Sequence, residues 1–233
     1  MSTEMTPAQT LREENRRNRD RYGITAWFYD LLDAPWERQY RKWRPKLVGD
    51  LHGEVLEAGV GTGRNLKYYP SHVKLTALDF SPAMLRHASR RRSGAACSVR
   101  LLQDDASDMT TVEPGRYDWV VATFLCCVLP EGLQTQAIAQ FERVLKPGGK
   151  FRLLEMVYSK DPVLRRRQEF FAPFVEKVYG ARFDRDTHRH LSNHSGLRIT
   201  AQTFITHDTY LLIEGEKVDF SSKDKASGGG PRE

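Results

Sequence analysis

The sequence predicts an α/β fold built on a mostly parallel sheet, and two observations carry this prediction. Between about residues 54 and 157, short apolar runs alternate with stretches of helical character. Such alternation is typical of a parallel sheet with helices on both faces. In addition, the first apolar run ends in three alternating glycines within residues 57–63, and the second run ends at Asp79. These strand ends indicate a ligand site at the carboxyl edge of the sheet.

The individual elements follow from the same pattern. Strands are predicted at residues 54–58, 74–79, 98–103, 117–123 and 150–157, and helices at residues 63–69, 82–92 and 131–145. Ser81 is a suitable N-cap for the second of these helices, because Pro82 then takes the first helical position. The last predicted elements are a helix at 162–180 and an antiparallel strand pair at 198–205 and 208–214.

A single domain is expected, because 233 residues can bury one core of substantial size. Residues 1–21 are polar and arginine-rich, and we predict a basic segment that is partly disordered or in contact with a membrane. Residues 22–215 form the predicted domain. Residues 216–233 are charged and then rich in Gly and Ser, a composition that predicts a disordered tail.

The glycines and the acid together describe a site for a nucleoside. Glycines after the first strand allow the backbone to approach a ligand closely, since no Cβ intervenes. A carboxylate at Asp79, at the end of the second strand, can accept hydrogen bonds from two ribose hydroxyls.

Two residues indicate which nucleoside is bound. Arg64 stands where the dinucleotide fingerprint G-x-G-x-x-G requires its third glycine, so a pyrophosphate cofactor fits poorly. Glu57, two positions before the first glycine, would repel a pyrophosphate but suits a ligand with an ammonium group. S-adenosylmethionine carries an ammonium, a sulfonium and a ribose, and no phosphate.

Longer stretches agree with this interpretation. Residues 57–63 followed by Asp79 resemble motif I and the acidic loop of class I S-adenosylmethionine-dependent methyltransferases. Further motifs of that family are similar to residues 79–85 (DFSPAML), 103–106 (QDDA), 117–123 (YDWVVAT) and 144–150 (VLKPGGK). The resemblance implies a Rossmann-like fold, with a mostly parallel seven-stranded sheet, helices on both faces and N-terminal amphipathic helices.

The resemblance also implies which residues hold S-adenosylmethionine and its product S-adenosylhomocysteine. Asp79 is expected to hold the ribose, and residues 59–63 the methionine part. The adenine is expected at Asp105 and Ala106, with Asp104 as the alternative to Asp105. The predicted cofactor-binding residues are Glu57, Gly59, Gly61, Gly63, Asn65, Asp79, Phe80, Ser81, Met84, Asp105, Ala106 and Thr123.

In related methyltransferases an N-terminal helix closes over the cofactor, and a tyrosine of that helix meets the cofactor or the substrate. Residues 28–32 (FYDLL) resemble this element. Tyr22 and Tyr29 lie seven residues apart and therefore share a helix face, so both are predicted catalytic residues that close the site. Pro35 is expected to interrupt the helix, and a second basic and aromatic segment follows at residues 36–46.

The substrate prediction rests on resemblance as well. The chain is similar to bacterial, Rhodobacter-type phosphatidylethanolamine N-methyltransferases and to quinone-biosynthesis C-methyltransferases. Residues 124–130 (FLCCVLP) also resemble membrane-associated thiol methyltransferases of animals. N-methylation of phosphatidylethanolamine toward phosphatidylcholine is the leading prediction. The alternatives are methylation of a quinone precursor or a small thiol, and a membrane- or nucleic-acid-binding module that senses the cofactor.

Charge and aromatic content favour an anionic membrane surface as the partner. The formal net charge is +6, and arginine or lysine alternates with Trp, Phe and Tyr in residues 11–46 and 162–180. Basic side chains attract lipid headgroups, while Trp and Tyr settle at the membrane interface. The alternative is that the aromatics pack on the core and the arginines form a solvated face. No nucleic-acid partner is expected, since no long lysine tract is present.

Other features limit where the protein acts and with what chemistry. The apolar stretch 119–130 is too short to span a bilayer, and residues 1–21 lack the apolar core of a secretory signal. Three cysteines do not suggest a disulfide framework, and the adjacent Cys126 and Cys127 are predicted to be buried. We therefore expect a monomer in the cytoplasm, peripheral on the inner membrane. No metal is expected, and an oxygen acceptor would need a base from His188, His190, His194 or His207.

Overall fold

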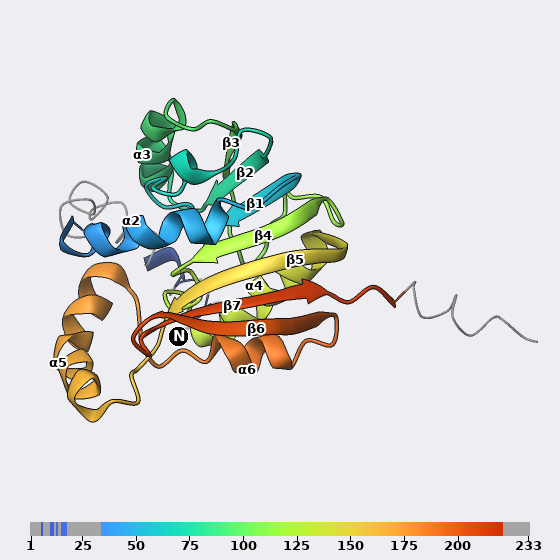
Figure 1. Ribbon diagram of the computed structural model, residues 1–233. Coiled ribbons are helices and arrows are strands. Elements are labelled where there is room, and N and C mark those ends of the chain that lie inside the picture. The colour runs from blue at the N-terminus through green and yellow to red at the C-terminus, as the bar shows by residue number, and fades with distance from the viewer. Residues whose placement is uncertain (1–5, 7–9, 12, 14, 18–33, 221–233) are drawn as a thin grey trace, which may run out of the picture.

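A seven-stranded sheet forms the centre of the protein (Figure 1). The computed structural model describes residues 6, 10, 11, 13, 15–17 and 34–220. The strands run in the spatial order β3-β2-β1-β4-β5-β7-β6. Their bounds are β1 Glu54–Ala58, β2 Lys74–Asp79, β3 Ser98–Gln103, β4 Tyr117–Thr123, β5 Leu145–Met156, β6 Leu197–Thr206 and β7 Tyr210–Lys217.

The first five strands pair in parallel, whereas β7 is antiparallel to both β5 and β6. From β1 the chain moves outward through β2 to β3, and then returns to place β4 on the other side of β1. The strand order therefore reverses between β1 and β4. Ligands bind open α/β sheets at such a switch point, beyond the carboxyl ends of the strands.

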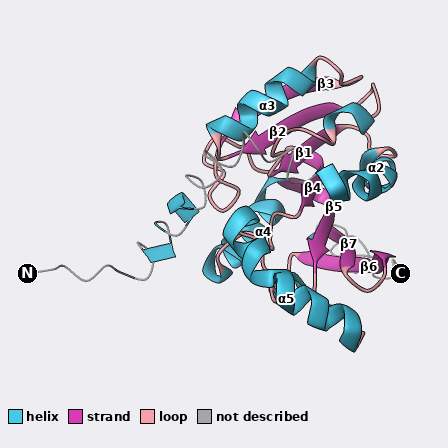
Figure 2. Cartoon of the chain, turned by 90° about the vertical axis from the view of Figure 1, so that its left-hand side faces the viewer, coloured by secondary structure: helices cyan, strands magenta, loops and turns pink. Residues whose placement is uncertain are grey.

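Helices cover both faces of the sheet, and Figure 2 shows the sheet between α2 and α4. Strand side chains alternate between the two faces, so that Val55 belongs to the core under α2 while Leu56 belongs to the core under α4. The helices are α2 Ala34–Val48, η1 Leu66–Tyr68 (a 3-10 turn), α3 Pro82–Arg92, α4 Glu131–Val144, α5 Pro162–Tyr179 and α6 Thr187–Ser192.

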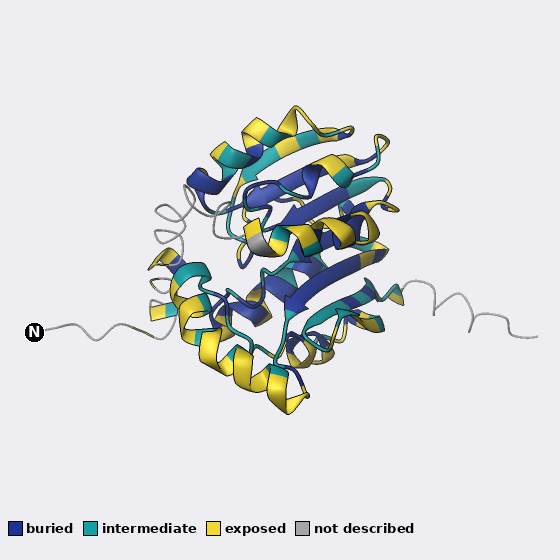
Figure 3. Cartoon of the chain, turned by 60° about the vertical axis from the view of Figure 1, so that its left-hand side comes forward, coloured by how far each residue is buried: buried dark blue, intermediate teal, exposed yellow. Residues whose placement is uncertain are grey.

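Helix α5 differs from the others because it packs on neither face. It lies beyond the carboxyl ends of the central strands, and none of its residues is buried (Figures 1 and 3). Its ends are nevertheless well defined. The Asp161 side chain accepts hydrogen bonds from the backbone of Val163 and Leu164, both at 2.9 Å, and Gly180 ends the helix in the left-handed conformation.

The predicted α/β fold and its mostly parallel seven-stranded sheet are confirmed, although several elements differ in detail. The helix expected at residues 63–69 is only the 3-10 turn η1, and Gly63, where the helix was expected to begin, has a φ of 80°, outside the right-handed helical region. Strand β5 begins at Leu145, five residues before the expected start. Helix α6 was not predicted.

The predicted interruption at Pro35 stays a prediction, because the helix expected to end there precedes the described residues. Pro35 is the second residue of α2, and proline is tolerated in the first turn because the N–H it lacks has no intrahelical acceptor there. The basic and aromatic segment 36–46 thus continues this helix. The helix predicted through Tyr22 and Tyr29 lies outside the described residues.

Candidate functional site

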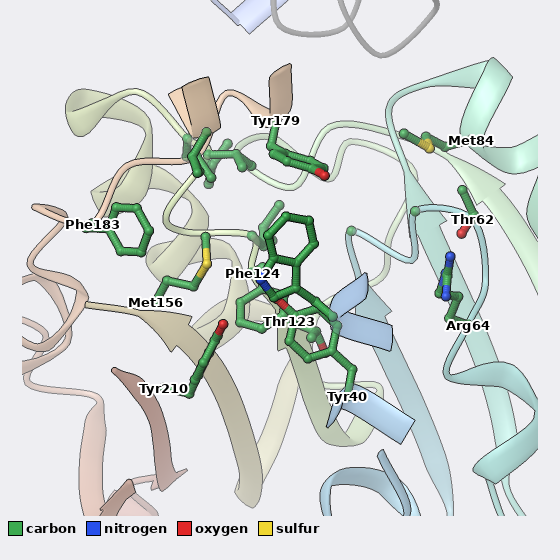
Figure 4. A pocket seen from close by; sticks show the side chains of 18 of the residues that line it. Tyr40, Thr62, Arg64, Met84, Thr123, Phe124, Met156, Tyr179, Phe183 and Tyr210 are labelled. Carbon is green, nitrogen blue, oxygen red and sulfur yellow. The ribbon is translucent and has the colours of Figure 1, made fainter. Parts of the chain in front are cut away.

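A cavity of about 760 Å³ opens at the switch point of the sheet. The ends of β1 and β4 and the loops after β1, β2 and β3 supply a polar half, which contains most of the predicted cofactor residues. The start of β7, the loop after β4 and helix α5 supply an apolar half (Figure 4). We call these the cofactor half and the acceptor half.

The glycine loop has open space above Gly61. A Cβ added at this position would meet no atom within 4 Å, although the residue lines the cavity. Its φ of 54° lies in the left-handed region, which glycine adopts without strain. Gly63, by contrast, faces the protein, since a Cβ there would lie 2.9 Å from the Ala88 Cα of α3. Gly61 therefore leaves room for a ligand, and Gly63 leaves room for a helix.

Asp79 connects the ends of the first two strands. Its Oδ2 accepts the Gly61 N–H at 2.8 Å and its Oδ1 accepts the Ser81 N–H at 2.9 Å. The side chain is buried, and this burial raises the pKa of Asp79 to about 6. Each carboxylate oxygen can accept a further hydrogen bond, so the group can still hold two ligand hydroxyls.

Glu57 places a second buried carboxylate under the glycine loop. Its Oε1 accepts the Asn65 amide at 2.6 Å, and its Oε2 accepts the Tyr69 hydroxyl at 3.1 Å. Burial raises the pKa of Glu57 to about 7. Asn65 is itself fixed by Arg44 Nη1 at 2.5 Å, and its amide also donates to Thr123 Oγ1 at 3.2 Å. The floor of the cofactor half is thus a connected polar network.

Helix α2 joins this network through Glu37, which the sequence did not single out. Glu37 Oε2 lies 2.7 Å from Arg64 Nη1 and 3.1 Å from Arg44 Nη2. Both arginines in the cofactor half are therefore paired with the same carboxylate. The position of Glu37, one turn before the aromatic residues of α2, carried no motif that could have identified it.

Of the two acids proposed for adenine, Asp105 lines the cavity. Its Oδ1 accepts the Ser107 hydroxyl at 2.7 Å, and its Oδ2 accepts the Asn15 amide at 2.6 Å. Asp104 instead accepts the backbone and hydroxyl of Thr111 outside the cavity. Asn15 is buried, so the N-terminal segment contributes a side chain to the cavity wall.

The acceptor half has an aromatic floor made by Tyr40, Phe124 and Tyr210 (Figure 4). The ring centroids lie 5.4 Å apart for Tyr40 and Phe124, and 6.0 Å apart for Phe124 and Tyr210. Phe124 has a φ of 56°, which is strained for a bulky residue. In this backbone conformation Phe124, the first residue after β4, lines the cavity.

The loop after β4 is held in place by a further buried acid. Glu155 accepts the backbone N–H groups of Cys126 at 3.0 Å and Cys127 at 2.9 Å. Burial raises the pKa of Glu155 to about 7 and that of both thiols well above the usual value. The prediction that the two cysteines are buried is confirmed. Glu155 lies near the end of β5 without a recognisable motif, so no local pattern identifies it as part of the site.

Most of the rest of the acceptor half is apolar, and Arg167 and Gln168 of α5 are among the polar residues that also line it. Residues of α5 at helical spacing face the cavity, opposite the loop after β4 and together with Met156 and Phe183. Phe170, Phe171 and Phe174 of this helix line the cavity and are also exposed to solvent, so this wall of the acceptor half is open to the surface. The predicted catalytic residues Tyr22 and Tyr29 lie outside the described residues.

Comparison with known proteins agrees with this geometry. Residues 55–149 match the family described as a methyltransferase domain. The chain contains a class I S-adenosylmethionine-dependent methyltransferase domain. The solved structure of the N-methyltransferase NodS from Bradyrhizobium japonicum, in complex with S-adenosylhomocysteine, superposes on this methyltransferase domain with a TM-score of 0.55 at 19% identity, covering 78% of this chain and 86% of that one.

Two curated relatives share more sequence with the chain. A phosphatidylethanolamine N-methyltransferase from Cereibacter sphaeroides is 37% identical over 42% of this chain and 48% of its own length. A demethylmenaquinone methyltransferase from Staphylococcus haemolyticus is 29% identical over 62% of each chain. The chain thus spans about half to two thirds of the curated relatives that it matches first.

The predicted methyltransferase class and S-adenosylmethionine as its cofactor are confirmed, and the cavity fits that cofactor. The open space above Gly61 admits a ligand close to the backbone. Two buried carboxylates, Glu57 and Asp79, suit a cation with a ribose. The neighbouring arginines Arg44 and Arg64 both pair with Glu37, which reduces the positive charge that a phosphate would meet in this half of the methyltransferase cavity.

Ten of the twelve predicted cofactor residues line the cavity, and two support it from behind. The ten are Glu57, Gly59, Gly61, Asn65, Asp79, Phe80, Met84, Asp105, Ala106 and Thr123. Gly63 packs against α3, as described above. Ser81 caps that helix by accepting the Met84 N–H at 3.4 Å and donates its own N–H to Asp79.

The four histidines considered as bases lie elsewhere. None of them lines the cavity of the described part of the chain. His190 contacts Thr135 and Glu131 between α6 and α4, and His194 contacts Glu142. Within residues 34–220 and the few described before them, no cluster of His, Cys, Asp or Glu could hold a metal ion. None of the helices among these residues has the length and apolarity needed to cross a membrane.

Proposed function

We propose that this methyltransferase adds methyl groups to the amine headgroup of phosphatidylethanolamine, toward phosphatidylcholine, while it lies on a membrane surface. The observation that carries the proposal is the composition of the acceptor half. An aromatic floor adjoins the cofactor half, and an apolar wall leads from that floor to exposed phenylalanines on α5. An amine with long acyl chains matches both parts.

The cofactor half would hold S-adenosylmethionine through Asp79 at the ribose and Asp105 at the adenine, with Glu57 near the charged methionine end. When bound, the cofactor supplies a sulfonium-activated methyl group, which an amine lone pair takes as the carbon–sulfur bond breaks and its electron pair stays on sulfur. The protein therefore has mainly to align the acceptor and exclude water.

The aromatic floor suits an amine acceptor in particular. A primary ammonium has a pKa of about 10 in water and must lose its proton before it reacts. Apolar surroundings favour the uncharged amine. As the new bond forms, positive charge moves onto nitrogen, where the faces of Tyr40, Phe124 and Tyr210 can stabilise it by cation–π attraction.

Helix α5 supports a membrane-surface location. Its exposed side chains include Phe170 and Phe171 beside Arg165 and Arg166. Aromatic rings and cations on one helix favour the boundary between headgroups and acyl chains. We place the protein on the cytoplasmic face of a membrane, with α5 turned toward the lipid and the cavity opening beside it.

The test uses purified full-length protein, labelled S-adenosylmethionine and vesicles that contain phosphatidylethanolamine. The expected product is labelled methylated phosphatidylethanolamine. In the variant Tyr210→Leu, transfer to the amine should fall about tenfold, because a cation–π contact is lost, while Tyr210→Phe keeps the ring and should retain most of the activity. Transfer to a soluble thiol or a quinol, with none to the lipid amine, would overturn the proposal.

A quinone precursor is the second candidate, because the demethylmenaquinone methyltransferase matches a longer part of the chain than the lipid enzyme does. An apolar cavity also suits a polyprenyl tail. Carbon methylation of a quinol requires a base to remove the phenolic proton. The described histidines lie outside the cavity, and an ammonium acceptor must also lose a proton, so the need for a base does not separate the two acceptors. Assaying both acceptors in parallel decides between the candidates.

A further inference from the structure

One charged side chain in the cavity wall differs from all the others. The charged residues that line the cavity are Arg44, Glu57, Arg64, Asp79, Asp105 and Arg167. The first five each have a hydrogen-bond or ion-pair partner within the protein. Among the described residues, the Arg167 side chain makes no hydrogen bond or ion pair, so its guanidinium is available for a ligand.

Helix α5 and its contacts with the body of the protein set the position of Arg167. On α5 it shares the cavity-facing stripe with Leu164 and Phe171, at spacings of three and four residues. The adjacent Gln168 fixes this part of the helix to the body of the protein. Its Oε1 accepts the Ser159 N–H at 2.8 Å, and its amide donates to the Val157 carbonyl at 3.0 Å. The helix, rather than a loop, thus sets the position of the guanidinium.

The neighbouring arginines of α5 have other environments. Arg165 pairs with Glu169 at 3.0 Å and stacks over the Tyr158 ring at 4.9 Å. Arg166 is exposed and does not line the cavity. Arg167 is also exposed, which puts it at the mouth of the acceptor half rather than at the aromatic floor. It is the arginine of this group that a bound acceptor would meet.

The chemistry of the group indicates its ligand. A guanidinium presents a planar fork of N–H donors that matches two oxygens of a phosphate. A phosphate at the mouth, an amine at the floor and apolar chains along α5 would together use every part of the acceptor half. The order of these parts is that of a zwitterionic headgroup at a lipid surface.

We infer that Arg167 binds the phosphate of the acceptor and makes the site selective for acceptors that carry one. The inference deepens the proposed function, since it concerns the same acceptor half. A phosphate could belong to a lipid headgroup or to a free phosphate compound, and both offer the same oxygens to the guanidinium.

Octyl phosphate and octanol separate the contribution of the anion from that of the chain. Both are titrated by calorimetry into full-length protein saturated with S-adenosylhomocysteine. Octyl phosphate should bind at least about tenfold more tightly than octanol, because a charge-assisted hydrogen bond is added. Arg167→Gln should remove this difference and leave octanol binding unchanged, and Arg167→Lys should retain part of it.

Arg166→Gln is the matched control, because it removes an equal charge one residue away outside the cavity. It should change the affinity for octyl phosphate by less than about twofold, as expected for a screened surface charge. Equal losses in Arg166→Gln and Arg167→Gln would show a general effect of charge and overturn the inference, as would unchanged binding in Arg167→Gln.

Inorganic phosphate, titrated in the same way, distinguishes the sources. Affinity for it equal to that for octyl phosphate, with the same dependence on Arg167, would assign the site to a free phosphate compound. Weaker binding would assign it to an alkylated headgroup. None of these titrations requires methyl transfer. If phosphate selectivity depends on Arg167 while phosphatidylethanolamine is not methylated, only the proposed function fails, and the reverse result rejects only the role of Arg167.

Discussion

The two halves of the cavity differ in how far their residues are buried and hydrogen-bonded. In the cofactor half, Asp79 and Glu57 are buried, and each of their carboxylate oxygens accepts a hydrogen bond from the protein. In the acceptor half, α5 contributes no buried residue, and Phe170 is 78% exposed. The cofactor half is therefore preorganised by the sheet, whereas the acceptor half is open to whatever surface supplies the substrate.

The two halves also differ in the free-energy cost that a bound ligand would relieve. Burial raises the pKa of Glu57 to about 7 and that of Asp79 to about 6, so the charged forms of both acids are destabilised in the folded protein. A cationic ligand with hydroxyl donors relieves that cost. The acceptor half instead exposes apolar surface to water, a cost that a lipid surface would relieve. Each half is completed by a ligand of a different kind.

The largest effect should come from removing the acid that organises the cofactor half. Asp79→Ala eliminates two hydrogen bonds to the loops and those to the ribose. We expect the Kd for S-adenosylmethionine to rise by about 100-fold or more, because hydrogen bonds to a charged group are worth about 1.5–3 kcal/mol each. Asp104→Ala is the matched control, since this acid bonds Thr111 outside the cavity. Comparable losses in both variants would contradict the assignment.

A smaller effect is expected from filling the space above the glycine loop. Gly61→Ala and Gly115→Ala share a positive φ and open surroundings, so both should lower the free energy of unfolding by about 1 kcal/mol. Only Gly61 lines the cavity. Calorimetry should therefore show a Kd for the cofactor about tenfold higher for Gly61→Ala alone, as expected for a lost close approach. An unchanged Kd would mean that the cofactor passes elsewhere.

The same contrast explains what could be predicted from the sequence. The cofactor half lies at strand ends, where Gly61 and Asp79 are adjacent in space because parallel strands finish at one edge. Local patterns are therefore enough to assemble it. The sequence left open whether Asp104 or Asp105 binds the adenine. The structure resolves this point, because only the Asp105 side chain lines the cavity.

The acceptor half depends on long-range contacts that no local pattern contains. Tyr40 and Tyr210 are far apart in sequence, and they meet only because α2 and β7 pack near the same strand end. The aromatic residues of 11–46 predict either a membrane-contacting surface or packing on the core, and Tyr40 and Trp43 are buried in the core. For residues 162–180 the periodicity predicts a helix. It does not indicate that α5 would line the cavity while its aromatic residues stay exposed to solvent.

A moderate effect is expected on the acceptor side. Phe170→Ser removes the most exposed phenylalanine of α5 and should reduce co-sedimentation with anionic vesicles about fivefold, equivalent to about 1 kcal/mol of lost apolar contact. Cofactor affinity and thermal stability should stay unchanged, because the ring is not buried. Phe204→Ser, at an exposed position of β6 outside the cavity, is the control. Equal losses in the two variants would remove α5 as the docking surface.

The smallest effect is a change with pH that runs in opposite directions for binding and for stability. The carboxylate of Asp79 accepts hydrogen bonds best when ionised, and its pKa is about 6. Lowering the pH from 7.5 to 5.5 protonates roughly three quarters of it and should raise the cofactor Kd about fourfold. Protonation of Glu57, with a pKa of about 7, acts in the same direction because the ligand is cationic.

Stability of the ligand-free protein should change the other way. Glu57, Asp79 and Glu155 have pKa values above those of an unfolded chain, so the folded protein takes up protons as the pH falls from about 7 to about 5. Their contribution to stability is complete at low pH and is lost as the pH rises through the folded values. Tm should therefore increase on acidification in this range while affinity decreases. Asp79→Asn should flatten both trends, and a parallel fall of Tm and affinity would show that the acids are ionised and satisfied before the cofactor arrives.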